Sequence, residues 1–190
     1  MPVEAAAAGW IGENPGDFFG VTVAAADLDG DGADELLADA MAWPGGGFAG
    51  AERRGRLYGL TLDTPTLADA GLVIDGDPGY QHLGQAVAAG DFDGDDIPDL
   101  AVSSPSQRGL DPTLPGRVLV WFGPVSGHHT AADADLSYAG ERPGDNAGYT
   151  LAAADVDADG TDDLVVGAPF SDEVARDAGE VYLLAGPLGR

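Results

Sequence analysis

The sequence of 190 residues contains no cysteine and no lysine. Without cysteine the chain cannot form disulfides, so its fold has to be held together by other means. The 33 acidic residues outnumber 8 basic residues, all of them arginine, and the formal charge is −25. A chain of this charge repels phosphate backbones and anionic lipid, which argues against nucleic acids and membrane surfaces as partners.

Long apolar runs are also missing. None reaches the roughly 18 residues of a membrane-spanning helix, so we expect no membrane insertion. The first residues, Met1 to Glu4, lack the basic region that opens a signal peptide. The hydrophobic content of 44% is nevertheless sufficient for a core, and 30 glycines with 13 prolines and no helical periodicity favour a β-rich fold.

An acidic segment occurs three times at a fixed spacing. Asp27–Gly32 recurs as Asp91–Asp96 and again as Asp155–Gly160, each 64 residues after the previous copy. A glycine stands seven residues before each first aspartate, and a leucine stands nine residues after it. Such a period indicates a repeated supersecondary unit. We therefore expect a single repeat array over 1–190, with repeats at 13–76, 77–140 and 141–190.

Short apolar segments at matching places in each repeat predict strands. First strands are expected at 21–26, 85–90 and 149–154, second strands at 36–38, 100–102 and 164–166, third strands at 55–60, 116–122 and 179–184, and fourth strands at 71–74 and 136–139, with 8–11 as a counterpart at the N-terminus. The Gly/Pro-rich stretches 44–50 and 107–115 are interpreted as loops. Four short strands per unit indicate an all-β fold of three β-propeller blades.

The third predicted blade lacks its fourth strand. Residues 5–12, of this chain or of another, are expected to supply it. The array is therefore a partial propeller or one that is completed by an oligomer.

The acidic segments have the composition of calcium loops. Calcium takes about 6 to 8 oxygen ligands, and alternate side chains of a tight loop can converge on one ion. With the first aspartate as position 1, acids stand at positions 1, 3, 5 and 9, and position 7 would add its carbonyl. The predicted ligands are Asp27, Asp29, Asp31, Ala33 and Glu35 in the first loop, Asp91, Asp93, Asp95, Ile97 and Asp99 in the second, and Asp155, Asp157, Asp159, Thr161 and Asp163 in the third.

Other interpretations of these loops fit less well. Solvated Asp-Gly turns would explain one cluster, but not three at one period. An EF-hand needs a glutamate at position 12, where this chain has Ala38, Val102 and Val166. Magnesium prefers sites that retain several waters, and zinc prefers nitrogen or sulfur ligands. Position 6 requires a positive φ, which suits glycine and is tolerated by Asp96.

Two short motifs resemble a known family, the FG-GAP repeats of the integrin α-subunit N-terminal β-propeller and its bacterial relatives. The FG motif is Phe19-Gly20, altered to Leu83-Gly84 and Ala147-Gly148, and the GAP motif is Gly167-Ala168-Pro169, altered to Ser103-Ser104-Pro105 and lost at Asp39-Ala40-Met41. The resemblance implies structural calcium in the loop between the first two strands of each blade. It also implies a non-catalytic scaffold for protein recognition, adhesion or self-assembly, extracellular or at the cell surface, whose signal peptide is not part of this sequence.

Three blades are too few for the closed ring of that family. We expect either a homodimer that completes a six-bladed ring or the rest of a larger propeller, with a protein or glycan as ligand. The alternative is a propeller-based carbohydrate-active enzyme or a carbohydrate-binding module. An enzyme of that kind needs an acid and a base outside the metal loops, and the sequence places no such pair.

Histidine, tryptophan and arginine side chains outside the acidic loops are further candidates for function. His128 and His129 are expected in a loop without a partner. Trp43 is the best candidate among the tryptophans for a ligand contact, whereas Trp121 is expected in the core. The cluster of Arg53, Arg54 and Arg56 is interpreted as solvated loop residues, with a seam or an acidic ligand as the alternative.

Overall fold

The computed structural model describes residues 6–44, 53–78, 82–105 and 113–189. Over these residues the fold is all-β, with only two short 3-10 helices, η3 (Leu67–Asp69) and η4 (Ala131–Asp133). The strands are β1 (Phe19–Ala26), β2 (Glu35–Ala40), β3 (Arg56–Leu60), β4 (Leu72–Asp75), β5 (Val87–Gly90), β6 (Asp99–Ser104), β7 (Arg117–Trp121), β8 (Gly127–Thr130), β9 (Leu136–Ala139), β10 (Thr150–Ala154), β11 (Asp163–Ala168) and β12 (Glu180–Leu184). The predicted all-β fold class is confirmed.

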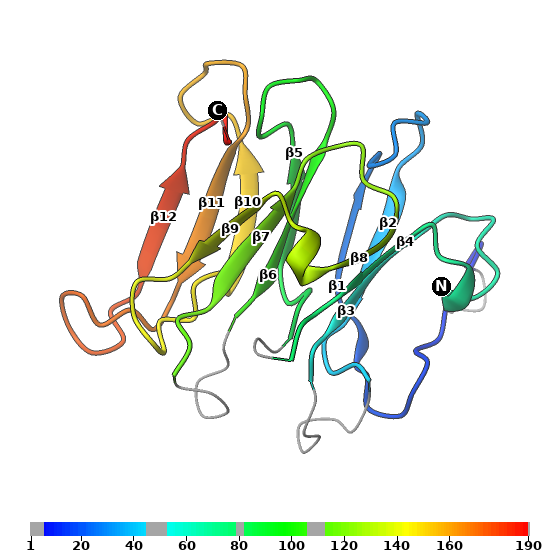
Figure 1. Cartoon of the computed structure of the whole chain (residues 1–190), viewed down its shortest axis with the longest axis horizontal. Coiled ribbons are helices and arrows are strands. Elements are labelled where there is room, and N and C mark those ends of the chain that lie inside the picture. Colours follow the sequence, from blue (N-terminus) through cyan, green and yellow to red (C-terminus); the bar gives the residue numbers. More distant parts are fainter. Residues whose placement is uncertain (1–5, 45–52, 79–81, 106–112, 190) are drawn as a thin grey trace.

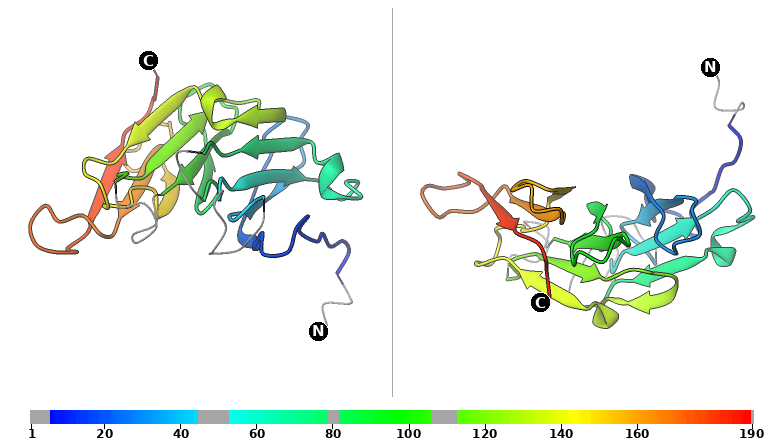
Figure 2. Two further views of the ribbon diagram at one scale, coloured as in Figure 1. Left: turned by 60° about the horizontal axis from the view of Figure 1, so that its bottom comes forward. Right: turned by 90° about the horizontal axis from the view of Figure 1, so that it is seen from above.

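The strands form three separate sheets that follow one another along the chain. Sheet 1 has the order β1-β2-β3-β4-β8, sheet 2 the order β5-β6-β7-β9, and sheet 3 the order β10-β11-β12. Figure 1 shows the three sheets side by side, and the inner strands β1, β5 and β10 contact one another in turn. The view from above in Figure 2 shows that the array is open at both ends. This arrangement is that of propeller blades without a closed barrel.

Apolar side chains fill the spaces between the sheets. The central strands β2 and β6 lie between two partners and are buried along most of their length, which explains why their sequences are almost continuously apolar or small. Leu37 and Leu57 of sheet 1 pack against Leu100 and Trp121 of sheet 2. On the other side of sheet 2, Val118 and its neighbours pack against sheet 3. Each sheet therefore buries one face against the next.

Two predicted local structures are wrong. The segment 8–11 is not a strand, because Trp10 turns onto sheet 1 and donates its indole N–H to the carbonyl of Thr64 at 2.8 Å, while Ile11 is 88% exposed. The loop around His128 contains a strand, β8, which pairs in parallel with β4 and covers the outer edge of sheet 1. Neither segment has the alternation of apolar and polar residues that marks a half-buried strand.

Other predictions on organisation are not tested by these sheets. The repeat boundaries at 13–76, 77–140 and 141–190 stay predictions. The expected loops at 44–50 and 107–115 lie mostly outside the described residues. Among the residues that the structure describes, no helix has the length and apolar character needed to cross a membrane.

Candidate metal centres

The three acidic loops connect the first and second strands of their sheets. They join β1 to β2, β5 to β6 and β10 to β11, and all three lie on the upper edge of the molecule in Figure 1. The residue before position 1 pairs with position 9 in each antiparallel register, as Ala26 with Glu35, Gly90 with Asp99 and Ala154 with Asp163. The strand pairing therefore closes each loop at the same length.

The carboxylate at position 1 organises the loop backbone. Asp27 accepts the N–H groups of Gly30 and Gly32, both at 2.9 Å. Asp91 accepts three such bonds at 2.7 to 3.0 Å, and Asp155 accepts two at 3.1 Å. Bonds of an aspartate to backbone N–H groups ahead of it stabilise a tight turn. The turn directs the carboxylates of positions 1 and 3 toward one another.

In each loop three carboxylates gather. One oxygen from each lies within 4.8 Å of the others in the groups Asp27, Asp29 and Glu35; Asp91, Asp93 and Asp99; and Asp155, Asp157 and Asp159. Positions 1 and 3 belong to every group. Position 9 joins them in the first two loops, whereas position 5 does so in the third.

The remaining predicted ligands lie outside these groups. Asp31 and Asp95 each accept the N–H of the residue two positions later, at 2.8 and 2.9 Å. Asp163 accepts the N–H groups of Val156 and Gly186, both at 2.9 Å. The ligand roles of these side chains, and of the carbonyls of Ala33, Ile97 and Thr161, stay predictions.

Position 9 is also a buried anchor of the loop. Glu35, Asp99 and Asp163 are 5%, 0% and 1% exposed, and each accepts the N–H of position 2 in its own loop. Burial raises the pKa of Glu35, and it raises that of Asp99 to about 6 despite the bonds from Gly123 and Phe92. The cause is that a buried carboxylate loses its hydration and is penalised in its charged form.

Two oxygens in these groups need a further partner. Glu35 Oε1 and Asp93 Oδ1 are buried and have no hydrogen-bond partner among the described residues. In loops 2 and 3 the oxygen equivalent to Glu35 Oε1 accepts an N–H from Gly123 or Gly186. An anionic oxygen that is buried without a partner is costly, and a cation would remove this cost. The oxygen-only donor set suits a hard ion such as Ca²⁺.

Two positions in each loop have a left-handed backbone conformation. The sequence predicted it for position 6 but not for position 4. Position 6 has a positive φ in all three loops, at 93° for Gly32, 68° for Asp96 and 97° for Gly160. Position 4 is also left-handed, and in the third loop it is Ala158 with φ at 63°. Glycine at 30 and 94 was the available signal for position 4.

The loops contact the neighbouring repeats. The carbonyl of Leu28 accepts the N–H of Val125 at 2.7 Å, and that of Phe92 accepts the N–H of Leu188 at 2.7 Å. Leu28 and Phe92 are therefore fully buried, whereas Val156, at the same place in the third loop, is 58% exposed. Each of the first two loops is held in place by the repeat that follows it.

The other residues considered for function have structural partners. Trp43 donates to Glu13 at 2.9 Å, and the guanidinium of Arg56 lies 3.5 Å from its ring centre, so that face of Trp43 is covered. Trp121 is 2% exposed, which confirms its place in the core.

The interpretation of the arginine cluster as solvated is wrong for two members. Arg53 is 4% exposed, and Arg56 pairs with Asp75 at 2.5 and 3.1 Å. The fold explains the difference, because it places Arg53 beside His82 of the next repeat and Arg56 opposite Asp75 of β4. His128 also bonds to Asp75, at 3.0 Å.

Comparison with known proteins identifies the repeats. The FG-GAP repeat family matches residues 83–121 and 147–184. The chain carries FG-GAP repeats. The matched FG-GAP segments cover most of sheets 2 and 3, and the first copy, which has lost its GAP motif, repeats their strand order and acidic loop.

Relatives that share these FG-GAP repeats are much longer proteins. The chain is 34% identical over 161 residues to phosphatidylinositol-glycan-specific phospholipase D of Bos taurus. This match covers 80% of this chain and 19% of the phospholipase. It is 33% identical over 176 residues to integrin alpha-IIb of Homo sapiens, covering 86% of this chain and 16% of the integrin. The chain thus spans about a fifth or less of the length of these relatives.

Proposed function

We propose that this chain is a calcium-stabilised scaffold for protein recognition, adhesion or self-assembly, without a catalytic role of its own. The observation that carries the proposal is the gathering of three carboxylates in each of three loops on one edge of the array. Carboxylates held this close repel one another, and a divalent cation converts the repulsion into attraction. Calcium therefore stabilises the strand connections of every repeat.

The role as a scaffold is supported by the relatives. Integrin alpha-IIb and integrin alpha-PS2 of Drosophila melanogaster share this region, the latter with 39% identity over 108 residues, which is 54% of this chain and 7% of the integrin. We propose an extracellular or cell-surface location on the same ground. The ligand is a protein or a glycan.

The enzymatic alternative has less support. Phospholipases D are among the relatives, but the shared part is 19% of the bovine protein. Of the histidines, His82 is fully buried, His128 bonds to Asp75, and His129 bonds to the carbonyl of Ser126. A general acid or base has to reach a substrate, and these positions do not favour that use.

Thermal unfolding of chelator-treated protein tests the proposal. A ligand that binds only the folded state at 100 times its Kd stabilises it by about 2.7 kcal/mol per site. For a chain of this size that corresponds to roughly 5 to 10 °C per site. We expect the melting temperature to rise on addition of calcium, and to rise less in the variant Asp155→Ala/Asp157→Ala.

The matched control is Asp63→Ala/Asp69→Ala, which removes the same charge at exposed positions outside the loops. Its calcium response should equal that of the unchanged protein. An unchanged melting temperature at millimolar calcium would contradict the proposal.

A further inference from the structure

The outer face of sheet 3 is apolar and open. Val181 and Leu183 of β12 are 69% and 50% exposed. Val118 and Val120 stand at the same places in β7, two and four residues after the glycine that precedes the strand, and they are 1% and 0% exposed because sheet 3 covers them. Sheet 3 therefore presents the kind of surface that sheet 2 buries.

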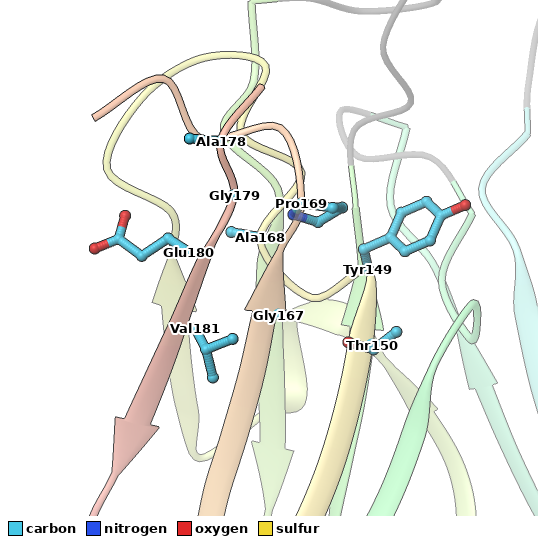
Figure 3. A pocket seen from close by; sticks show the side chains of 9 residues that line it. All are labelled: Tyr149, Thr150, Gly167, Ala168, Pro169, Ala178, Gly179, Glu180 and Val181. Carbon is cyan, nitrogen blue, oxygen red and sulfur yellow. The ribbon is translucent and has the colours of Figure 1, made fainter. Parts of the chain in front are cut away.

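A groove of about 480 Å³ lies on this face, over Gly167 and between β10 and β12 (Figure 3). Tyr149 and Thr150 line one side, and Val181 lines the other. The positions equivalent to Gly167 in sheets 1 and 2 are Asp39 and Ser103, which are both fully buried. The groove thus marks a place that is filled in the interior of the array.

The neighbours of Asp39 and Ser103 show which residues fill this position inside the array. A methyl group added to Gly84 would lie 2.7 Å from Cβ of Asp39, and one added to Gly148 would lie 2.9 Å from Cβ of Ser103. These glycines stand three and two residues before the first strands of the following repeats, β5 and β10. The contact between two sheets therefore requires a glycine of the next repeat against this position of the preceding one.

The first sheet carries the other half of this contact. Gly20 occupies the place of Gly84 and Gly148, but a methyl group there would meet no atom within 4 Å. Val23 of β1 is 62% exposed, whereas Val87 and Leu151, at the same register, pack against the preceding sheet. The two ends of the array thus show complementary halves of one interface.

We propose that the open face of sheet 3 binds a second copy of this chain, through the surface around Gly20 and Val23 of its β1. On the face of sheet 1 that points away from sheet 2, Trp10 and Trp43 cover the part over β2 and β3. The contact therefore forms mainly through the inner strand β1. Two such head-to-tail contacts related by a two-fold axis join the copies into a closed dimer. The inference deepens the proposed scaffold role, because it names the partner and the surface.

The choice of a second copy follows from the chemistry of both surfaces. The open face of sheet 3 offers small and branched apolar side chains on β10, β11 and β12 rather than a row of charges. The exposed part of β1 is apolar in the same way. Since each copy has a formal charge of −25, calcium and salt should strengthen the dimer by reducing the repulsion between copies.

Light scattering with size exclusion at micromolar concentration in calcium tests the inference. The expected mass is twice the chain mass of 19.2 kDa. Val181→Asp/Leu183→Asp should give the monomer mass. Val23→Asp, on the other surface, should do the same, because both halves are needed. The control Val174→Asp alters a side chain that is 86% exposed outside the face and should remain dimeric.

An equimolar mixture of the two monomeric variants provides a second measurement. One of its two head-to-tail contacts joins unchanged surfaces, so the mixture should regain part of the dimer mass. A monomer mass for the unchanged protein would overturn the inference. Dimerisation that survives Val23→Asp would also overturn it, because the face of sheet 3 would then pair with another surface.

The calcium response keeps this inference distinct from the proposed function. Each variant should retain its rise in melting temperature with calcium, which shows that it is folded. A monomer that is stabilised by calcium overturns the dimer alone, whereas a protein without any calcium response overturns the scaffold proposal.

Discussion

His82 is fully buried at the junction of the first two repeats, and burial together with the charge of Arg53 lowers its pKa to about 4. Its backbone has φ at 63°, and the equivalent residue of the third repeat is Asn146 with φ at 56°. This burial could not be predicted from the sequence, because a single histidine before a Leu-Gly pair has the composition of an exposed turn. The fold buries it between two repeats.

The titration of His82 predicts a loss of stability in acid. Above pH 6.5 the side chain is neutral in both states, and between pH 6.5 and 4 only the unfolded chain takes up the proton. The free energy of unfolding should therefore fall over this window, by on the order of 3 kcal/mol at its lower end. His82→Asn keeps a residue that tolerates the left-handed backbone and should remove this contribution.

Urea unfolding at pH 7 and at pH 4.5 measures the effect as a difference between the protein and the variant. The buried Asp39, with a pKa raised by burial to about 7, responds with the opposite sign, but it is present in both proteins and cancels. His129→Asn serves as the control outside the buried junction. A difference that does not depend on pH would contradict the assignment to His82.

The acidic loops are the elements that sequence reasoning described best. A fixed period and the acids at positions 1 and 3 were sufficient to locate all three groups. The roles of Asp31 and Asp95 could not be predicted in the same way, because an aspartate in a turn can face either an ion or a backbone N–H. The strand β8 was missed since its pairing with β4 depends on a neighbour from another repeat.

Position 4 of the loops provides a prediction on loop strain. Ala158 has φ at 63°, a conformation that costs an alanine about 1 kcal/mol relative to glycine. Ala158→Gly should therefore stabilise the protein by up to about 1 kcal/mol in chemical unfolding. Gly30→Ala makes the reverse change at the same place in the first loop, where φ is 78°, and should destabilise by a similar amount. Equal signs for the two variants would contradict this account.

At the largest scale, the described residues form an array of three sheets. The number of repeats and the all-β class could be predicted from the sequence. The period of 64 residues and the glycines between the predicted strands are both visible in the sequence itself. The packing of Trp10 onto sheet 1 and the exposure of Val181 on sheet 3 could not be predicted. Both depend on which face of each sheet has a neighbouring sheet.

Calcium binding is the central claim at the scale of the whole molecule, and its stoichiometry is the most direct test. Chelator-treated protein is dialysed to equilibrium against buffered calcium, and the bound metal is measured by elemental analysis. We predict three calcium ions per chain, and two for Asp155→Ala/Asp157→Ala. No bound calcium at millimolar free concentration, or the same number in the protein and the variant, would contradict the account.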